Sequence, residues 1–365
     1  MENFGLKIAE GSEITNLTIP TGTSFPANDN VGEMFYRTDT NTLHIRNNTG
    51  WELANKPTKN YIINGNFDIW QRGATISTST SAGDYTADRW SGITNSRTGR
   101  QAGNGDNLYG VFGRTIEGTT SRDIVQPIEL NDKKPRTTFP LGNVYTLTFK
   151  IHSDVAESGA TITPTVSCYF GDSYTDNTET NTVEIIKTGN PDNAWVDVEA
   201  RITITGDATG KTAMWVMLRG IYSVGQSSAI ECRFGKAKLE DGNIATFFEF
   251  KKYSEELALC QRYYEDSKSP LLDGSCISSV LVNDTSSSVS DDHTGTTFKV
   301  EKRVIPTVTL RTRLGGVGAV NRWNDSAETV SAIASGLTKS HIGRILTASN
   351  ITYATEYNYT ADAEI

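Results

Sequence analysis

The chain has 365 residues, a formal net charge of −9 and a pI near 5.1. An acidic surface argues against DNA, RNA or anionic lipid as the main partner, because each of these is bound through a basic surface. No apolar run approaches the roughly 20 residues that a membrane span requires. The first residues lack the basic start and apolar core of a signal peptide, which fits a protein released by cell lysis.

The cysteines and histidines show no spacing that is typical of a metal or redox site. The four histidines are scattered singly, and the cysteines form no C-x-x-C pair. A chain of this length does not depend on a disulfide framework. We therefore expect the four cysteines to be buried as small apolar side chains; they are Cys168, Cys232, Cys260 and Cys276.

Residues 1–58 form a short N-terminal segment that we expect to attach to a larger assembly. Residues 1–30 are polar and turn-rich, whereas 31–53 predict a β-hairpin with strands at 34–36 and 43–45 and Trp51 after a second turn. An isolated hairpin is marginally stable in water, so association of copies would supply the missing core. The alternative is a two-strand extension of the next domain. A linker is predicted at 56–59.

Residues 60–250 alternate as half-buried antiparallel strands do. Apolar residues occupy every second position of 196–204 and of 145–151. Further strands are predicted at 162–170, 213–222, 230–234 and 237–239, with 213–222 apolar on both faces. Frequent turns and no intervening helix predict a β-sandwich of the jelly-roll type.

The stretch from Asn60 to Trp90 organises this domain. An apolar strand start at 61–63 runs into Asn64-Gly65-Asn66, a tripeptide suited to a tight turn with positive φ. A separate segment, 206–212, contains glycine, lysine and threonine as phosphate-binding loops do. Because it precedes a strand rather than a helix, a hairpin turn is the better interpretation.

The remaining chain consists of a helical connector and a second β domain. Residues 253–266 predict a helix with Ser254 as N-cap and Leu257, Cys260 and Tyr264 on one face. We place this connector at 251–268. Strands are then predicted at 277–282, 297–301, 307–310 and 351–353, so residues 269–365 are expected to form a small β-sandwich-like domain.

Several stretches resemble bacteriophage tail-fibre and receptor-binding proteins with a carbohydrate-binding β-sandwich. They are NYIINGNFDIWQRG with YTADRW in 60–90, FGKAKLEDGNIATFFEF with YSEELALCQRYYE in 234–265, VGEMFYRTDTNTLHIRNNTGWE in 31–52, and FKVEKRVIPTVTL with a terminal ADAEI. This resemblance implies a virion protein, usually a homotrimer, that attaches to other virion proteins by its N-terminal segment and binds host surface glycans. Nucleic acid and membrane insertion are not expected.

The same resemblance implies a structural calcium ion. In related carbohydrate-binding sandwiches, one acid near the first strand and another near the last strand hold the metal. Asp68 and Glu240 match those positions here, although the position inside the last strand where an acid is expected holds Gly235 or Lys236. Calcium prefers six to eight oxygen ligands, of which these two residues supply only a part.

The sequence contains no recognisable catalytic constellation, so no enzyme activity is expected. Sugar binding needs exposed aromatic faces for the C–H side of the ring, with amides or carboxylates for the hydroxyls. The candidates in polar loops are Tyr109, Tyr174 and Trp323, each of which could instead lie at an interface between copies. The tryptophans in strand patterns favour core packing; they are Trp70, Trp90, Trp195 and Trp215.

These observations predict a tail-fibre adhesin that recognises host glycans. The alternative is a structural virion component, such as a head fibre or tail adaptor, that does not bind glycans. A polysaccharide-degrading enzyme is a further alternative, but it would need two convergent carboxylates, and no repeat typical of a parallel β-helix is present.

Overall fold

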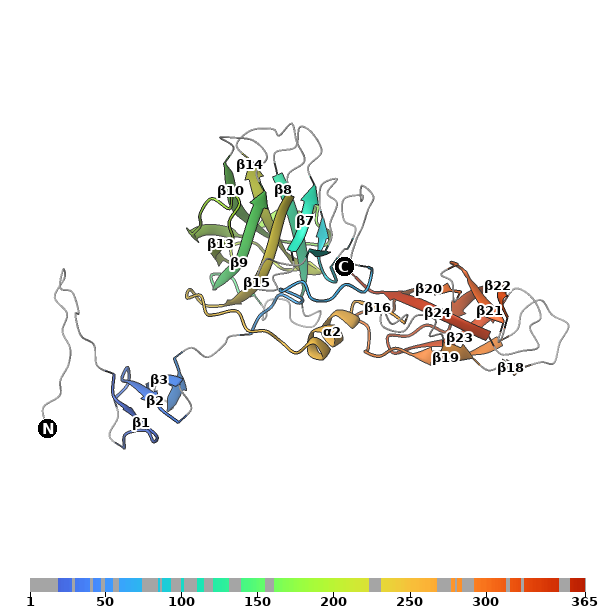
Figure 1. Cartoon of the computed structure of the whole chain (residues 1–365), viewed down its shortest axis with the longest axis horizontal. Helices are drawn as coiled ribbons and strands as arrows, with labels where there is room; N and C mark the ends of the chain where they lie inside the picture. Colours follow the sequence, from blue (N-terminus) through green and yellow to red (C-terminus); the bar gives the residue numbers. More distant parts are fainter. Residues whose placement is uncertain are drawn as a thin grey trace, which may run out of the picture. The chain divides into compact units, whose positions relative to one another are not determined.

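The computed structural model divides the chain into two compact units, Met1–Thr58 and Lys59–Ile365 (Figure 1). The structure describes residues 19–27, 30–39, 42–46, 50–54, 59–73, 85, 87–92, 100–101, 110–114, 121–130, 139–154, 161–222, 231–267, 277–279, 281–283, 292–312, 316–322, 325–347 and 355–364. The protein is mainly β, with antiparallel sheets and a β-sandwich as predicted.

The first unit is a small four-stranded sheet. Its strands are β1 (Thr21–Gly22), β2 (Met34–Arg37), β3 (Thr42–Arg46) and β4 (Trp51–Leu53), paired in that order. The predicted hairpin is therefore confirmed as β2–β3. Phe25 stacks on Trp51 with ring centroids 5.1 Å apart, and both rings contact Phe35 edge-on. A few aromatic rings thus make the core of this unit, which is typical of a sheet too small to enclose a larger one.

The β-sandwich of the second unit has two antiparallel sheets (Figure 1). One sheet has the order β11-β10-β14-β8-β5, and the other has the order β12-β13-β9-β15-β7-β6. From β8 onward the longest strands alternate between the sheets, as in a jelly roll. The bounds are β5 Ser91–Gly92, β6 Arg100–Gln101, β7 Gly110–Arg114, β8 Ser121–Glu129, β9 Val144–Asp154, β10 Ile162–Gly171, β11 Glu179–Thr180, β12 Thr182–Lys187, β13 Val196–Thr203, β14 Ala213–Tyr222 and β15 Glu231–Asp241.

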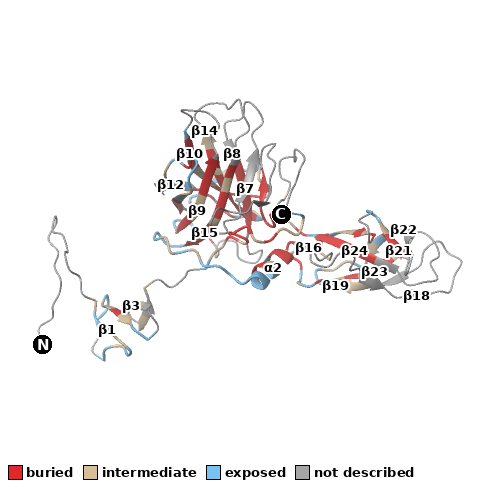
Figure 2. Cartoon of the chain, in the orientation of Figure 1, coloured by how far each residue is buried: buried red, intermediate tan, exposed pale blue. Residues whose placement is uncertain are grey.

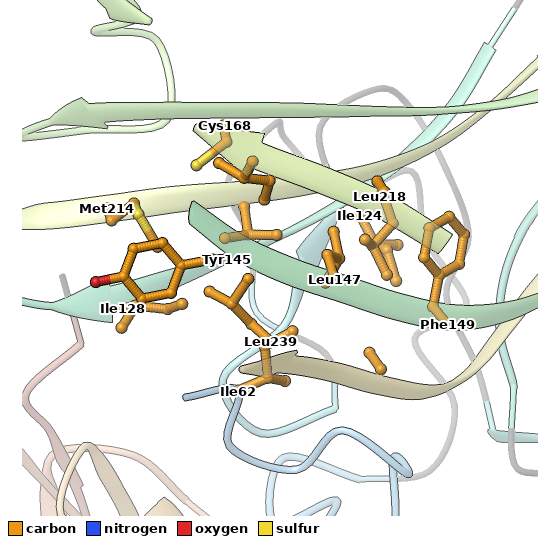
Figure 3. Close-up of a cluster of buried hydrophobic side chains, with 14 of the residues drawn as sticks. Ile62, Ile124, Ile128, Tyr145, Leu147, Phe149, Cys168, Met214, Leu218 and Leu239 are labelled. Carbon is orange, nitrogen blue, oxygen red and sulfur yellow. The ribbon is translucent and has the colours of Figure 1, made fainter. Parts of the chain in front are cut away.

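The main hydrophobic core lies between these sheets (Figure 3). Leu147 and Phe149 of β9 face Ile124 of β8 and Leu218 of β14, and Ile62 closes one end beside Leu239. Strands of both sheets are largely buried (Figure 2). The period-two pattern read from the sequence thus places one row of side chains in this core and the other row outside it.

Strand β14 is buried on both faces, as its continuous apolar pattern predicted. Met214, Val216 and Leu218 point into the main core. Ala213, Trp215 and Met217 form a second cluster on the other face of the sheet. Trp215 is 2% exposed, and its indole N–H donates to the carbonyl of Gly171 at 3.1 Å.

Three local predictions are corrected by the structure. Residues 61–63 are not a strand: Tyr61 donates one backbone hydrogen bond to Leu239, and the Asn60 side chain accepts from the Leu239 N–H. The segment 206–212 is no hairpin, because it connects β13 in one sheet to β14 in the other. The strands predicted at 230–234 and 237–239 are the single strand β15, which bulges between Gly235 and Lys238.

The predicted connector helix is shorter than expected. Helix α2 runs from Tyr253 to Gln261 with Lys252 as N-cap, rather than Ser254, and β16 (Tyr264–Asp266) follows it. The strand replaces the last helical turn because residues 264–266 pair with the final strand of the chain. The buried side chains of α2 are Glu256, Cys260 and Gln261.

The C-terminal strands surround a second hydrophobic core. They are β17 Ile277–Ser279, β18 Leu281–Asn283, β19 Asp292–Thr297, β20 Thr307–Arg311, β21 Ala319–Arg322, β22 Asp325–Ser335, β23 His341–Thr347 and β24 Thr355–Asp362. The prediction at 297–301 is wrong beyond Thr297, and 351–353 lies outside the described residues. The first part of β22 pairs with β21 and its last residues pair with β23, so this one strand connects the two parts of the sheet.

Buried ionic contacts join the two cores of the second unit. Arg89 pairs with Glu364, and both side chains are at least 95% buried. The Arg89 guanidinium also lies 3.5 Å from the centre of the Tyr263 ring. A separate buried pair lies within the C-terminal part, where Lys302 donates to Glu265 at 2.6 Å and both side chains are fully buried. The four-part domain division made from the sequence stays a prediction, since residues 59–365 form one unit with two cores.

The cysteine prediction is confirmed where the structure describes it. Cys168, Cys232 and Cys260 are buried, and burial raises the pKa of Cys168 to about 12. Cys276 lies outside the described residues. Among the residues that the structure describes, no helix has the length and apolar character to cross a bilayer.

Candidate functional site

The structure locates one of the three aromatic residues predicted to bind ligand. Tyr174 follows β10, is half-buried, and packs against the outer cluster of Trp215 and Met217. Its backbone carbonyl accepts a hydrogen bond from the Tyr169 hydroxyl at 2.6 Å. These contacts hold the loop on the sheet. Tyr109 and Trp323 lie outside the described residues, so the role of all three in binding stays a prediction.

The tryptophans predicted to pack in the core do so to different extents. Trp90 is fully buried, and Trp70 packs against the same core from its edge. Trp215 belongs to the outer cluster. Trp195 is half-buried beside His152, with ring centroids 5.4 Å apart.

The residues do not fit a calcium ion at Glu240. Its carboxylate is fully buried and pairs with the Lys238 ammonium at 2.9 Å. The backbone N–H and the hydroxyl of Thr246 also donate hydrogen bonds to the Glu240 carboxylate, at 2.8 and 2.6 Å. An ammonium group therefore takes the place where the cation was expected. Within the described ranges, no group of three or more His, Cys, Asp or Glu is arranged to hold a metal.

Asp68 lies in a different place, in a pocket beside the turn at 60–68. Asn64 adopts φ +55° and Phe67 adopts φ +57°, so the chain reverses twice within a few residues. Gly65 permits this because a Cβ there would lie 2.1 Å from the carbonyl oxygen of Ala237. Phe67 is fully buried against Trp90, at 4.9 Å between ring centroids. This packing keeps a bulky residue in the left-handed region, where it would otherwise be disfavoured.

The pocket brings this turn together with the segment between β15 and α2. It encloses about 300 Å³, part of it open to solvent. The space in it that a water molecule can enter holds about one such molecule. The lining residues are Asn60, Gly65, Asn66, Asp68, Phe248, Glu249, Phe250, Lys251 and Glu256. Glu240 is not among them, so the two acids predicted to share a metal do not share this pocket.

The polar side of the pocket is formed by Asn66 and Asp68. The Asn66 side-chain NH₂ group faces both carboxylate oxygens of Asp68 at 3.2 Å, which orients the amide. The Asn66 side chain is 9% exposed, and its amide oxygen has no hydrogen-bond partner. An acceptor left unpaired at such burial is uncommon in folded proteins.

The opposite side is formed by Glu256 of α2 and by the aromatic segment. Glu256 accepts the backbone N–H of Asn64 and pairs with Lys251 at 3.5 Å, so it holds the turn and the segment together. Phe248 and Phe250 meet edge-to-face at 5.2 Å. Phe250 keeps 59% of its surface exposed. An exposed ring beside amides and carboxylates is the combination that sugars require.

One titratable group beside the turn with a perturbed pKa is Asp88. Its backbone carbonyl accepts from the Asn64 side chain at 3.0 Å, and its carboxylate accepts the backbone N–H of Gln71 at 2.9 Å. Burial raises the pKa of Asp88 to about 6. Asp88 is fully buried and does not line the pocket. The lining residues include no serine, cysteine or histidine, but three of them carry carboxylates: Asp68, Glu249 and Glu256.

Sequence reasoning missed the pocket residues other than Asp68. The signal that could have indicated them is the run Phe247-Phe248-Glu249-Phe250 in a polar segment after the last strand of the sandwich. Several large apolar residues near it are more than half exposed: Ile244, Phe247, Phe250 and Tyr253. The position of the turn at 60–68, which is distant in the sequence, decides which of these residues line a pocket. The segment alone therefore could not identify them.

No protein-family model and no curated protein sequence matches this chain. Solved structures similar to it include the tripod from the baseplate of bacteriophage Tuc2009, with a TM-score of 0.31, 15% identity, and coverage of 55% of this chain and 60% of that one. A structure of carbohydrate-binding modules from the β-sandwich superfamily has a TM-score of 0.29, 14% identity, and coverage of 55% and 72%. A family 30 carbohydrate-binding module has a TM-score of 0.27, 10% identity, and coverage of 51% and 87%.

Proposed function

We propose that this protein is a bacteriophage receptor-binding fibre protein that attaches the virion to glycans on the host surface. The observation that carries the proposal is that the stretches resembling such proteins, far apart in the sequence, meet in one buried network. Arg89 in the ADRW stretch pairs with Glu364 in the terminal ADAEI. Asn64 in the NGN turn donates to Glu256, in the YSEELALCQRYYE stretch. The resemblance therefore falls on residues that depend on one another physically.

This arrangement suits a protein that connects a bound receptor to the virion through rigidly joined domains. The sandwich and the C-terminal strands are connected by buried ion pairs rather than by a loose linker. The N-terminal sheet is a separate small unit, to which we assign attachment to other virion proteins. As a homotrimer, the protein would present several weak glycan sites at once, and avidity would then exceed the affinity of a single site. We assign adhesion without catalysis.

The test is binding of the purified protein to intact bacteria from a panel of strains, before and after periodate oxidation of their surface sugars. We expect saturable binding to at least one strain, lost after periodate treatment, by a protein that light scattering shows to be a trimer. Shortening of the cell-surface polysaccharide during incubation would instead identify an enzyme.

A second candidate is a structural virion component, and one observation favours it. Ile244, Phe247, Phe250 and Tyr253 expose large apolar surfaces within ten residues, as protein–protein interfaces do. A folded trimer that binds no strain and no polysaccharide, but captures another protein from disrupted virions, would support this candidate over the adhesin.

A further inference from the structure

The buried amide oxygen of Asn66 determines what kind of group the pocket accepts. This oxygen is an acceptor, because the NH₂ group of the same amide faces Asp68. In the free protein this oxygen has almost no accessible surface. Because a buried acceptor without a donor is costly, a small shift of the Asn66 side chain that admits a donor is favourable. Asp68 adds carboxylate oxygens beside it. The two residues together therefore favour a ligand that carries hydrogen-bond donors, such as the hydroxyls of a sugar.

The charge of the lining restricts the sugar further. Asp68, Glu249 and Glu256 are acidic and Lys251 is basic, a formal balance of −3 + 1 = −2. Because like charges repel, sugars with a carboxylate, such as uronic or sialic acids, are disfavoured here. A neutral sugar carries donors without that penalty.

Size and shape point to one sugar residue held at its edge. The pocket has room for about one water molecule, which suits a hydroxyl group and excludes a whole ring. Phe250 lines the pocket with 59% of its surface exposed, and the Lys236 ammonium lies 5.4 Å from the centre of its ring, which leaves the other ring face for a ligand. The ring of the sugar can therefore lie against Phe250 while a hydroxyl reaches Asn66 and Asp68.

We propose that this pocket, between the 60–68 turn and residues 248–251, binds the hydroxyl edge of one neutral sugar residue of a host glycan. This inference rests on the proposed function and assigns its binding site. Asn66 and Asp68 accept hydrogen bonds from the sugar hydroxyls, and Phe250 packs against the C–H face of the ring. Asn60 and Gly65 shape the turn through their contacts with Ala237 and Leu239.

The experiment measures binding of the full-length protein to an array of bacterial polysaccharides, some neutral and some rich in uronic acids. Asn66→Ala removes the proposed hydrogen-bond acceptor, and Phe250→Ala removes the ring proposed to contact the sugar. Phe247→Ala is the matched control, because Phe247 is 57% exposed in the same segment and does not line the pocket. Asp68→Asn keeps the shape of the side chain and removes its charge. Thermal unfolding of each variant shows that it is folded.

We expect the wild-type protein to bind neutral polysaccharides and to discriminate against uronic acids. Asn66→Ala and Phe250→Ala should each weaken binding about tenfold, the loss expected for one hydrogen bond or one stacking contact. Phe247→Ala should bind like the wild type. The methyl glycoside of a neutral hexose should compete with the bound polysaccharide, whereas glucuronic acid should not.

The outcomes separate the site from the function. If the wild type binds and both pocket variants bind as well as Phe247→Ala, the site is overturned and the adhesin function stands. If uronic acids bind as strongly as neutral sugars, the assigned sugar class is overturned. If the wild type binds neither cells nor polysaccharides, the proposed function fails and this inference fails with it.

Discussion

Asp88 shows how one buried acid at the organising turn affects the whole unit. Its side chain is fully buried and accepts hydrogen bonds from both the backbone and the side chain of Gln71. Burial raises its pKa from 3.8 to about 6, and the positive charge of Arg72 opposes that rise. An acid whose pKa is higher in the folded than in the unfolded state favours folding when protonated. The contribution of Asp88 to stability is therefore greatest at low pH and falls as the pH rises from about 4 to 6.

At the residue scale, we predict that Asp88→Asn reduces the pH dependence of stability. From the two pKa values, the wild type should lose about 2 kcal/mol between pH 4.5 and 7.5 that the variant does not lose. Guanidinium unfolding at both pH values measures the difference. Asp197→Asn is the control, since that carboxylate is 58% exposed, and it should behave like the wild type. Parallel pH profiles of Asp88→Asn and the wild type would contradict the assignment.

At the scale of elements, the 60–68 turn depends on a close approach between two backbones. The Gly65 carbonyl accepts the Ala237 N–H at 2.8 Å, and the Gly65 Cα leaves no space for a methyl group. Ala237 lies at the bulge of β15, beside Lys236 with φ +49°. The turn and the bulge therefore fit each other, and the pocket residues on the turn are positioned by this contact.

We predict that Gly65→Ala destabilises the protein by about 3 kcal/mol, the upper end of the cost of overpacking. Gly242→Ala is the matched control. Gly242 has φ +95° but open space around it, so that variant should cost only about 1 kcal/mol of backbone strain. Chemical unfolding compares the two. Equal losses would show that the contact with Ala237 is not what requires glycine at position 65.

At the scale of the whole molecule, the cores of the second unit are coupled by the pair between Arg89 and Glu364. Both side chains are nearly fully buried, and Arg89 also donates to the carbonyl of Pro127 on β8. Arg72 lies 3.6 Å from the centre of the Tyr264 ring and 3.5 Å from Glu364. The last residues of the chain are thus held by the loop that precedes β5.

We predict that Arg89→Ala costs about 3 to 5 kcal/mol, because it leaves the Glu364 carboxylate buried without its partner. Arg201→Ala removes an arginine from an exposed pair with Glu184 and should cost less than about 1 kcal/mol. Calorimetry should show one transition for the wild type and Arg201→Ala, and two for Arg89→Ala. A single, barely shifted transition for Arg89→Ala would show that the cores are coupled by other contacts.

The strands of the sandwich were predictable because their signal is local. Alternation at 145–151 and 196–204 places successive side chains on opposite faces, whatever the rest of the chain does. The turn at 64–66 was also predictable from its residue types. Errors arose where distant contacts decided the outcome. Residues 264–266 form a strand because they pair with β24. Residues 61–63 are irregular because the Asn60 side chain, and not a backbone carbonyl, accepts the hydrogen bond of the Leu239 N–H.

The sequence by itself determined the mainly β architecture, the burial of the cysteines that the structure describes and the doubly buried β14, since periodicity and composition act over a few residues. Only the tertiary structure decided the pocket and the ion pairs. Asn64 and Glu256 are 192 positions apart, and no local pattern relates them. Glu240 differs, because its partner Lys238 is two positions away and lies on the same face of β15. What only the tertiary structure decided there is that this face is buried, which makes the ammonium the cation that Glu240 requires.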